Sequence, residues 1–365
     1  MPEACVPHDG AGLGTSSMHA IAPLRGSTAS SGDGYAPSCA SRKSGQVRAL
    51  PRGSSTLAQC LLRECRAVRT QHSLANRETI PMRKPPTGEP YAGKPPVRFG
   101  GRGRRKRSLP LSLWIDGHAR LLVDAGGGIF LRFGEAKAKF ESLDAIAITH
   151  LHADHVADLV ALLKSGFFSD RTRALPLIGP SGGGAFPGIG EYMQALFDPK
   201  HGAYRYLSGY LDGSGGLVKV PVTEVKTQPP KAEVVFKTAQ FQVTSIGVTH
   251  GPVPALAFLV EAGGHRIAFS GDQSGDNPAF ASLIKGADIL IMDHAVPEAA
   301  DEVAGKLHAR PSEIGKLAAS AGVGKVVLSH NMARSLTHLD ENLALIRKDY
   351  KGPVAVADDL MCLDF

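Results

Sequence analysis

The feature that most constrains this 365-residue chain is a cluster of histidines and an aspartate directly after an apolar run. The run at residues 145–148 leads into the sequence Thr-His-Leu-His-Ala-Asp-His. His150 and His152 are two residues apart, so on extended backbone their side chains point to the same side and can bind one cation. Asp154 and His155 follow at the expected strand-to-helix turn and face a second position beside the first. A loop of solvated histidines is the alternative, but the density of ligand-type side chains favours a metal site.

Three further candidate ligands each follow an apolar, strand-like run. Residues 242–249 lead to His250, residues 266–271 lead to Asp272, and residues 325–329 lead to His330. Taken singly, each would more often be a hydrogen-bonded residue at a strand end than a ligand. Their shared placement favours a joint role as ligands. Histidine and aspartate side chains without cysteine suit zinc or a similar divalent ion that keeps an open position for water or substrate.

With these residues in place, the chain resembles the metallo-β-lactamase superfamily of hydrolases from about residue 112 to the C-terminus. The resemblance implies an α/β fold, a four-layer α/β/β/α sandwich with the metals at one edge of its two sheets. It also implies two Zn²⁺ ions, or other divalent transition metals, and seven ligands. The expected ligands are His150, His152 and His250 for the first ion, Asp154, His155 and His330 for the second, and Asp272 between the two.

Within the superfamily, the chain most resembles the branch of ribonuclease Z, phosphodiesterases and arylsulfatase-like enzymes. Its Ser270-Gly271-Asp272 matches the bridging-aspartate motif of that branch, and residues 307–318 resemble the segment that carries an extra active-site histidine, here His308. Two positions depart from the pattern. Met292-Asp293-His294 stands where ribonuclease Z usually has His-Glu, and Asn331-Met332 replaces the usual small polar residue after the last ligand.

The resemblance predicts a binuclear zinc hydrolase that uses a metal-bridging hydroxide to cleave a phosphodiester or aryl sulfate-type ester of a small molecule. Asp154 would be both a ligand and the residue that orients the nucleophile. His308 would stabilise or protonate the departing oxygen. Two alternatives stay open: a ribonuclease Z-type endonuclease, and a lactone or thioester hydrolase that would not need His308.

Positive charge is concentrated at the N-terminus. Residues 1–110 contain 18 Lys and Arg against 6 Asp and Glu, whereas the remaining residues contain 23 against 28. The formal net charge of +7 therefore arises outside the part that carries the candidate ligands. A nucleic-acid partner is compatible with this distribution but disfavoured, because the phosphate backbone is bound by clustered positive charge.

The segment 181–216 lies between the two sets of candidate ligands and is rich in Gly and Tyr. Its only fixed positive charges are Lys200 and Arg205, so it is a poor substitute for the Gly-rich, basic arm with which ribonuclease Z enzymes grip transfer RNA. Tyr206 or Tyr210 could stack on a substrate ring, with core packing as the alternative. We therefore expect a small-molecule ester as the substrate.

The composition divides the chain into two parts. Residues 1–108 are rich in Ser, Gly, Pro and Arg and lack helical or strand periodicity, which predicts a disordered basic segment. Residues 109–365 are expected to form the hydrolase domain. Neither a secretory signal nor an apolar run long enough to span a membrane is evident. We therefore expect a cytoplasmic protein without membrane contact, for which a homodimer is compatible.

Local patterns predict the elements of the hydrolase domain. Val156, Leu159, Val160 and Leu163 recur at helical spacing, which predicts a helix directly after the metal motif. The glycines at 126–128 predict either a tight strand-to-helix turn or a close approach of the backbone to the site. The remaining expected elements are a hairpin at 111–116 and 120–124, strands at 176–180, 234–238, 242–249 and 256–261, and helices at 311–321 and 339–349.

Overall fold

The structure, a computed structural model, describes residues 112–363, which contain two β-sheets. In the first sheet, an antiparallel hairpin is followed by three strands that run parallel to its second strand. The five strands lie in sequence order: β1 (Ser112–Ile115), β2 (His118–Val123), β3 (Ala145–Ala147), β4 (Leu177–Pro180) and β5 (Val222–Val225).

The second sheet contains seven strands and is mixed. Its first four strands pair antiparallel, and the last three add to it in parallel. In spatial order these are β12 (Val354–Val356), β11 (Lys325–Ser329), β10 (Ile289–Asp293), β9 (His265–Phe269), β8 (Val253–Ala262), β7 (Phe241–His250) and β6 (Glu233–Lys237).

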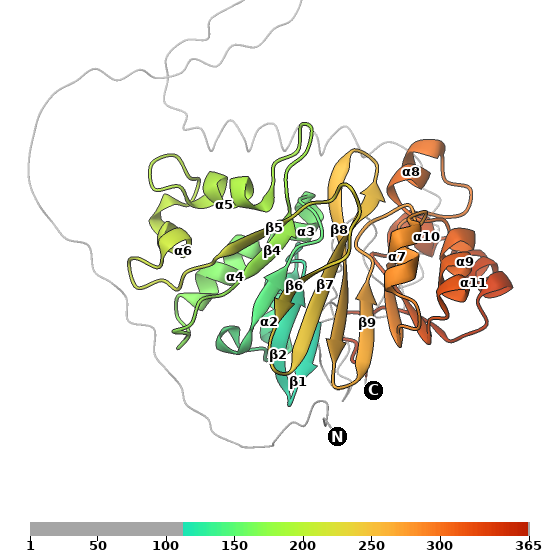
Figure 1. Cartoon of the computed structure of the whole chain (residues 1–365), viewed down its shortest axis with the longest axis horizontal. Coiled ribbons are helices and arrows are strands. Elements are labelled where there is room, and N and C mark those ends of the chain that lie inside the picture. Colours follow the sequence, from blue (N-terminus) through green and yellow to red (C-terminus); the bar gives the residue numbers. More distant parts are fainter. Residues whose placement is uncertain (1–111, 364–365) are drawn as a thin grey trace, which may run out of the picture. The chain divides into compact units, whose positions relative to one another are not determined.

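Helices cover the outer face of each sheet, as Figure 1 shows. Those on the first sheet are α2 (Ile129–Glu135), α3 (Ala153–Val156), α4 (Leu159–Gly166), α5 (Ile189–Phe197) and α6 (Gly209–Asp212), with short 3₁₀ turns at Phe140–Ser142 and Arg205–Leu207. Those on the second are α7 (Pro278–Leu283), α8 (Glu302–Leu307), α9 (Pro311–Ala321), α10 (Ala333–Leu336) and α11 (Leu339–Asp349). No helix among residues 112–363 is long and apolar enough to cross a membrane.

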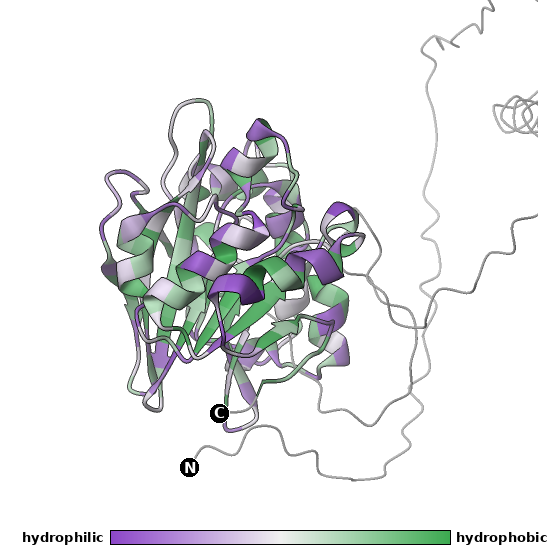
Figure 2. Cartoon of the chain, turned by 90° about the vertical axis from the view of Figure 1, so that its right-hand side faces the viewer, coloured by the Kyte–Doolittle hydropathy of each residue, from purple (hydrophilic) through white to green (hydrophobic). Residues whose placement is uncertain are grey.

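Three clusters of buried apolar side chains separate four layers of structure. Successive residues of a strand point to opposite faces of its sheet, so one strand can contribute to two clusters. Ala145 and Ala147 of β3 pack between the sheets, while Ile146 packs against the helices of the first sheet. In β11, Val327 packs between the sheets and Leu328 packs against the other helical layer. The predicted α/β/β/α sandwich is confirmed. Figure 2 shows that the apolar strands lie in the interior and that the helices outside them carry polar residues.

Most predicted elements are present, and the differences have local causes. The helix expected through Val156 and Leu163 is broken into α3 and α4, because the backbone N–H of Asp158 donates to the carbonyl oxygen of Ala125 and not within the helix. The Asp158 carboxylate accepts hydrogen bonds from the backbone N–H groups of Gly128 and Phe130. The predicted disordered segment 1–108, the boundary at 108/109 and the first residue of the expected hairpin lie outside the described residues.

The Gly- and Tyr-rich segment 181–216 forms helices that pack on the first sheet. Tyr210 is fully buried in the core of this half, and its hydroxyl donates a hydrogen bond to the carbonyl oxygen of Leu163. The core-packing alternative is therefore correct for Tyr210, and stacking on a substrate ring is excluded. Tyr206 is 67% exposed.

Candidate metal centre

The candidate ligands come from both sheets and meet at one edge of the sandwich. His150 follows β3 of the first sheet, and the next turn carries His152, Asp154 and His155. The second sheet contributes the last residue of β7, His250, together with two residues that follow β9 and β11, Asp272 and His330. All seven side chains that the sequence singled out are brought together, in overlapping groups whose ligand atoms lie within 4.8 Å of one another.

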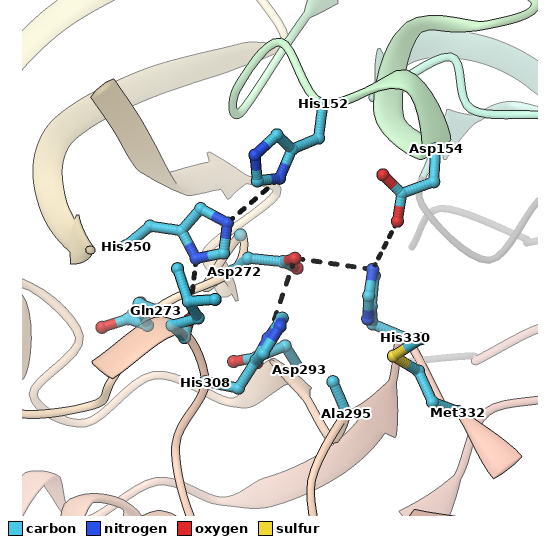
Figure 3. Close-up of polar contacts among 12 residues, drawn as sticks. His152, Asp154, His250, Asp272, Gln273, Asp293, Ala295, His308, His330 and Met332 are labelled. Atoms are coloured by element: carbon cyan, nitrogen blue, oxygen red, sulfur yellow. Dashed lines mark hydrogen bonds and ion pairs between the residues drawn. The ribbon is translucent and has the colours of Figure 1, made fainter. Parts of the chain in front are cut away.

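The first group consists of three imidazoles. His152 Nδ1 lies 3.0 Å from His150 Nε2 and 3.2 Å from His250 Nε2. Nitrogen atoms at the vertices of a tetrahedron around zinc, each 2.0–2.1 Å from the ion, would be about 3.3 Å apart. The Nδ1 of His250 donates to the carbonyl oxygen of Leu307 at 2.7 Å, so its Nε2 lone pair faces the group (Figure 3).

Burial keeps this group uncharged. It lowers the pKa of His150 well below its usual value, with help from the neighbouring His155, and lowers the pKa of His250 to about 4. The pKa of the half-buried His152 is lowered for the same reason. Neutral imidazoles are the form that binds a cation, so the group needs little preparation to accept one.

The second group combines two imidazoles with a carboxylate. His330 Nε2 lies 3.2 Å from Asp154 Oδ2, and this hydrogen bond is the main reason that the pKa of Asp154 falls well below its usual range. His155 Nε2 lies 3.9 Å from the same oxygen. Burial alone would lower the pKa of His155, but the carboxylates of Asp272 and Asp124 outweigh it and raise that pKa well above its usual value.

The Asp272 carboxylate lies between the two groups. Its Oδ2 is 3.5 Å from the Nε2 atoms of both His155 and His330, and 3.9 Å from His150 Nε2. Asp272 is almost fully buried. Although burial opposes ionisation, His330 and His155 hold the pKa of Asp272 well below its usual range. A carboxylate in this place can contact ions in both groups.

His308 lies beside Asp272 at the start of the loop between α8 and α9. Its Nδ1 is 3.8 Å from Asp272 Oδ2 and 3.0 Å from Asp293 Oδ2, and its ring stacks near the ring of His330 (Figure 3). Burial lowers the pKa of His308 to about 4. Burial and the neighbouring Asp272 raise the pKa of Asp293 well above its usual value. The sequence noted Asp293 only as a departure from a pattern and assigned it no role.

Asp124 is a second residue of the site that the sequence did not single out. Its carboxylate accepts hydrogen bonds from the backbone N–H of Thr149 at 2.7 Å and from the Thr149 hydroxyl at 2.8 Å. It also lies 2.8 Å from His155 Nδ1 and so directs the other ring nitrogen, Nε2, toward Asp272. A signal was present, because Asp124 follows the apolar strand β2 much as Asp272 follows β9.

The glycine turn after Asp124 satisfies both of its expected roles. It joins β2 to α2, and it also brings backbone against the metal motif. A Cβ atom at Gly126 would lie 1.8 Å from the carbonyl oxygen of Asp154. Any side chain at this position would therefore displace the turn that carries Asp154.

The donor set fits a divalent transition metal. Imidazole nitrogen and carboxylate oxygen are the ligand types that zinc and related ions accept. His155 Nε2 is buried and makes no hydrogen bond within residues 112–363, although its partner on the opposite ring nitrogen is in place. A buried, oriented and unsatisfied nitrogen that faces two carboxylates is expected where a cation binds.

Known proteins are similar to this chain in sequence and in fold. A family model described as the beta-lactamase superfamily domain matches residues 119–331. The ribonuclease Z of Mycobacterium bovis (strain BCG / Pasteur 1173P2) is 28% identical over 273 residues, which cover 70% of this chain and 91% of that protein. The ribonuclease Z of Mycobacterium sp. (strain KMS) is 30% identical over 243 residues, covering 62% of this chain and 78% of that protein. The crystal structure of the short form of human tRNase Z shares the fold, with a TM-score of 0.53, 21% identity, and coverage of 69% of this chain and 90% of that one.

Fold, donor set and relatives together define a metal-dependent hydrolase that acts on ester bonds. The chain belongs to the beta-lactamase superfamily, in the branch that includes ribonuclease Z.

Proposed function

We propose that this protein is a binuclear zinc hydrolase that cleaves a phosphodiester or aryl sulfate-type ester of a small molecule. The observation that carries the proposal is the position of Asp272. Its Oδ2 faces imidazole nitrogens of both groups at 3.5 to 3.9 Å, as a carboxylate shared by two ions requires. One carboxylate of this kind distinguishes a binuclear centre from a single-ion site with a spare histidine.

The chain's own residues divide the work of the reaction. When bound, the ions supply Lewis acidity and lower the pKa of water. Asp154, whose side chain is 48% exposed, faces the solvent side and is placed to orient the attacking water. His308 lies on the other side of Asp272, where it can stabilise or protonate the departing oxygen. An anionic ester bound beside His308 would oppose the effect of burial and favour its protonated ring.

A fixed positive charge beside His308 supports an anionic substrate. The Nε of Arg334 donates to the carbonyl oxygen of Ala295 at 2.8 Å, and its Nη2 contacts the sulfur of Met332. Its charge also contributes to the low pKa of His308. Within residues 112–363 this guanidinium has no carboxylate at ion-pair distance, so it is available to a phosphoryl or sulfuryl oxygen.

Metal content and substrate preference test the proposal together. Purified full-length protein is expected to contain close to two zinc equivalents. Its kcat/KM is then compared on bis-p-nitrophenyl phosphate, an aryl sulfate, a lactone and a precursor transfer RNA. We expect the phosphodiester or the sulfate to be the best substrate. A stoichiometry that stays at one under zinc supplementation would overturn the role of Asp272 as a shared ligand.

A ribonuclease Z-type endonuclease is the second candidate. It is favoured by the relatives, since the match to the Mycobacterium bovis ribonuclease Z covers 91% of that protein. The excess of acidic residues after residue 110 and the two fixed positive charges of residues 181–216 argue for the smaller substrate. If the precursor transfer RNA had the highest kcat/KM of the four substrates, and if that kcat/KM fell steeply with salt concentration, the protein would be better described as an endonuclease.

A lactone or thioester hydrolase is the remaining alternative and predicts a different role for His308. Such an enzyme needs the metal ligands but no general acid for a poorly stabilised alcohol. A His308→Ala variant with unchanged turnover of a lactone would favour it.

A further inference from the structure

Most rings of the metal centre are held by a hydrogen bond on the nitrogen that faces away from the site. His155 is held by Asp124, His250 by the carbonyl oxygen of Leu307, and His150 lies 3.1 Å from the Thr149 hydroxyl. His330 differs. Its Nδ1 is buried and has no hydrogen-bond partner within the described residues. Among the same residues, its ring is held only on the site side, by Asp154 on Nε2 and by the stacked rings of His155 and His308. The position of this ring therefore depends strongly on the backbone that carries it.

The backbone of His330 adopts a conformation that residues other than glycine seldom adopt. Its φ is +51°, in the left-handed region. A residue with a side chain remains there only when its surroundings hold it in place. The residues that follow His330 should therefore contain the restraint.

Asn331 supplies this restraint and is itself held by a buried histidine. The Nδ2 of Asn331 donates to the carbonyl oxygen of Leu328 at 3.1 Å, which closes the end of β11. Its Oδ1 lies 2.8 Å from Nδ1 of His294, the fully buried residue that follows β10. The backbone N–H of His294 also donates to Ser329 at 2.8 Å, so β10 and β11 remain joined up to the turn that carries His330.

The opposite nitrogen of His294 is also occupied. The Nδ2 of Asn342, in α11, donates to His294 Nε2 at 3.0 Å and to the carbonyl oxygen of Ser335 at 3.0 Å. These partners fix a neutral ring with its hydrogen on Nδ1, because one amide oxygen accepts from it and one amide nitrogen donates to it. His294 thus joins the end of β10, the turn after β11 and the helical layer.

We propose that His294 is a positioning residue, which acts through Asn331 to fix the left-handed turn of His330 and so sets the affinity of the second ligand group for its ion. This role rests on the proposed binuclear function. His294 and Asn331 are also the two places where the sequence departs from the pattern of its branch. Their direct hydrogen bond explains the departures as one linked change: each side chain supplies the partner that the other needs.

Metal titration of the full-length protein tests this role without using turnover. Metal-free protein is titrated with Zn²⁺ in a calorimeter and with Co²⁺ by visible absorption. His152→Ala and His330→Ala identify which binding event belongs to which group. We expect His294→Ala to weaken the event that depends on His330 by about 10-fold and to leave the other event unchanged. This is the lower end of the roughly 10- to 100-fold loss caused by removing a direct partner of a ligand, because His294 acts through Asn331. Asn331→Ala should change the same event in the same direction.

A conservative variant and two controls separate positioning from general loss of stability. His294→Gln offers a donor and an acceptor on one side chain and should recover part of the lost affinity. Tyr350→Phe removes the hydrogen bond from Tyr350 to Val323 in the same helical layer, and should lower the Tm without changing either affinity. His338→Ala removes an exposed histidine just before α11 and should change neither quantity.

The outcomes are distinguishable. Unchanged affinities in His294→Ala and Asn331→Ala, or equal weakening of both ions, overturn the positioning role. If His294→Ala does not fold, Asn331→Ala decides alone. A wild-type stoichiometry of one overturns the binuclear proposal. The positioning role then stands only if His294→Ala and His330→Ala both weaken that ion, and it falls otherwise.

Discussion

The two ligand groups of the metal centre differ in charge because only the second contains a carboxylate and lies against others. The first, made of His150, His152 and His250, contains only imidazoles, and burial lowers their pKa values. In the second group, carboxylates raise the pKa values of His155 and His330 although burial opposes this. The first group is therefore neutral before an ion arrives, whereas the second holds protons that an ion must displace.

A ligand group that attracts a cation strongly is therefore not always the group that is already deprotonated when the cation arrives. A carboxylate adds attraction for a cation, but it also attracts protons to the imidazoles beside it. The second group should be the more dependent on its surroundings, namely on Asp124, Asp272 and the turn at His330. Substitutions at Asp272, His308 and Asp124, and a change of pH, test this difference between the groups.

Replacement of Asp272 should have the largest effect, because this carboxylate faces both groups. We expect Asp272→Asn to lose more activity than the roughly 100-fold that loss of an outer partner of a ligand causes, and to lower the metal content. The exposed Asp276, whose carboxylate accepts a hydrogen bond from the Ser274 hydroxyl, provides the matched control as Asp276→Asn. Elemental analysis and turnover of bis-p-nitrophenyl phosphate measure both effects. If Asp272→Asn kept two ions and full activity, Asp272 would not be a ligand shared by the two groups.

Replacement of His308 should affect the chemistry while leaving both groups loaded. General acid assistance contributes about 10²- to 10⁴-fold, and it matters most when the leaving alcohol is poorly stabilised. We therefore expect His308→Ala to slow an alkyl phosphodiester by about this factor and a p-nitrophenyl ester far less, with both ions retained. Equal losses on the two substrates, or loss of an ion, would contradict the role in leaving-group departure.

Replacement of Asp124 should weaken the second group more than the first, because Asp124 contacts His155 directly and reaches His150 through the Thr149 hydroxyl. With an amide at position 124, the Nδ1 of His155 loses its charged acceptor, and the affinity of the second group should fall by about 10- to 100-fold. Calorimetric titration of Asp124→Asn with Zn²⁺ measures this change. Asp144→Asn is the control, since Asp144 pairs with Arg173 at the opposite end of β3. If both binding events weakened equally, the two groups would not be independent.

Acidification should release the two ions in order. The raised pKa values of His155 and His330 mean that protons compete with the second ion as pH falls from neutrality, at about tenfold in affinity per pH unit for each proton displaced. The pKa of His250 is about 4, so the first group remains competent at lower pH. Metal content after desalting at a series of pH values between 5 and 8 should fall to one ion before it falls further. Simultaneous loss of both ions would show that the contrast in pKa does not control binding.

The sequence predicted the positions of the candidate ligands because each follows a recognisable apolar run. His250 ends β7, and Asp272 and His330 lie just beyond β9 and β11. The apolar runs predicted these strand ends, and the resemblance to the superfamily implied that they meet at one edge of the sandwich. Their roles as ligands stay predictions. Asp124 and Asp293 also follow apolar strands, but no spacing distinguishes a strand-end carboxylate that orients a histidine from one that faces solvent. Such roles depend on contacts between segments far apart in the chain.

The layers of the fold were predictable, but the segment 181–216 was not. Its glycines and tyrosines suggested a loop, although Ile189, Met193 and Phe197 recur at helical spacing and are all buried in α5. Tyr210 is buried because its hydroxyl finds a carbonyl partner in α4, a condition that composition does not reveal. The short strand β5 lacks an apolar run, since its two middle residues, Thr223 and Glu224, are polar and exposed, and it is defined by pairing with β4.

Because the ligands come from both sheets, a bound ion also affects the association of the two halves of the fold. The part before residue 226 contributes His150, His152, Asp154 and His155, and the part after it contributes His250, Asp272 and His330. Neither part alone contains a complete group, so two polypeptides separated in the connection at 226–232 would need each other to hold an ion tightly. Any ion that binds only the joined form also favours joining, by mass action. In the intact chain, by the same mass action, a bound ion would stabilise the packing of the two sheets in addition to the apolar core between them.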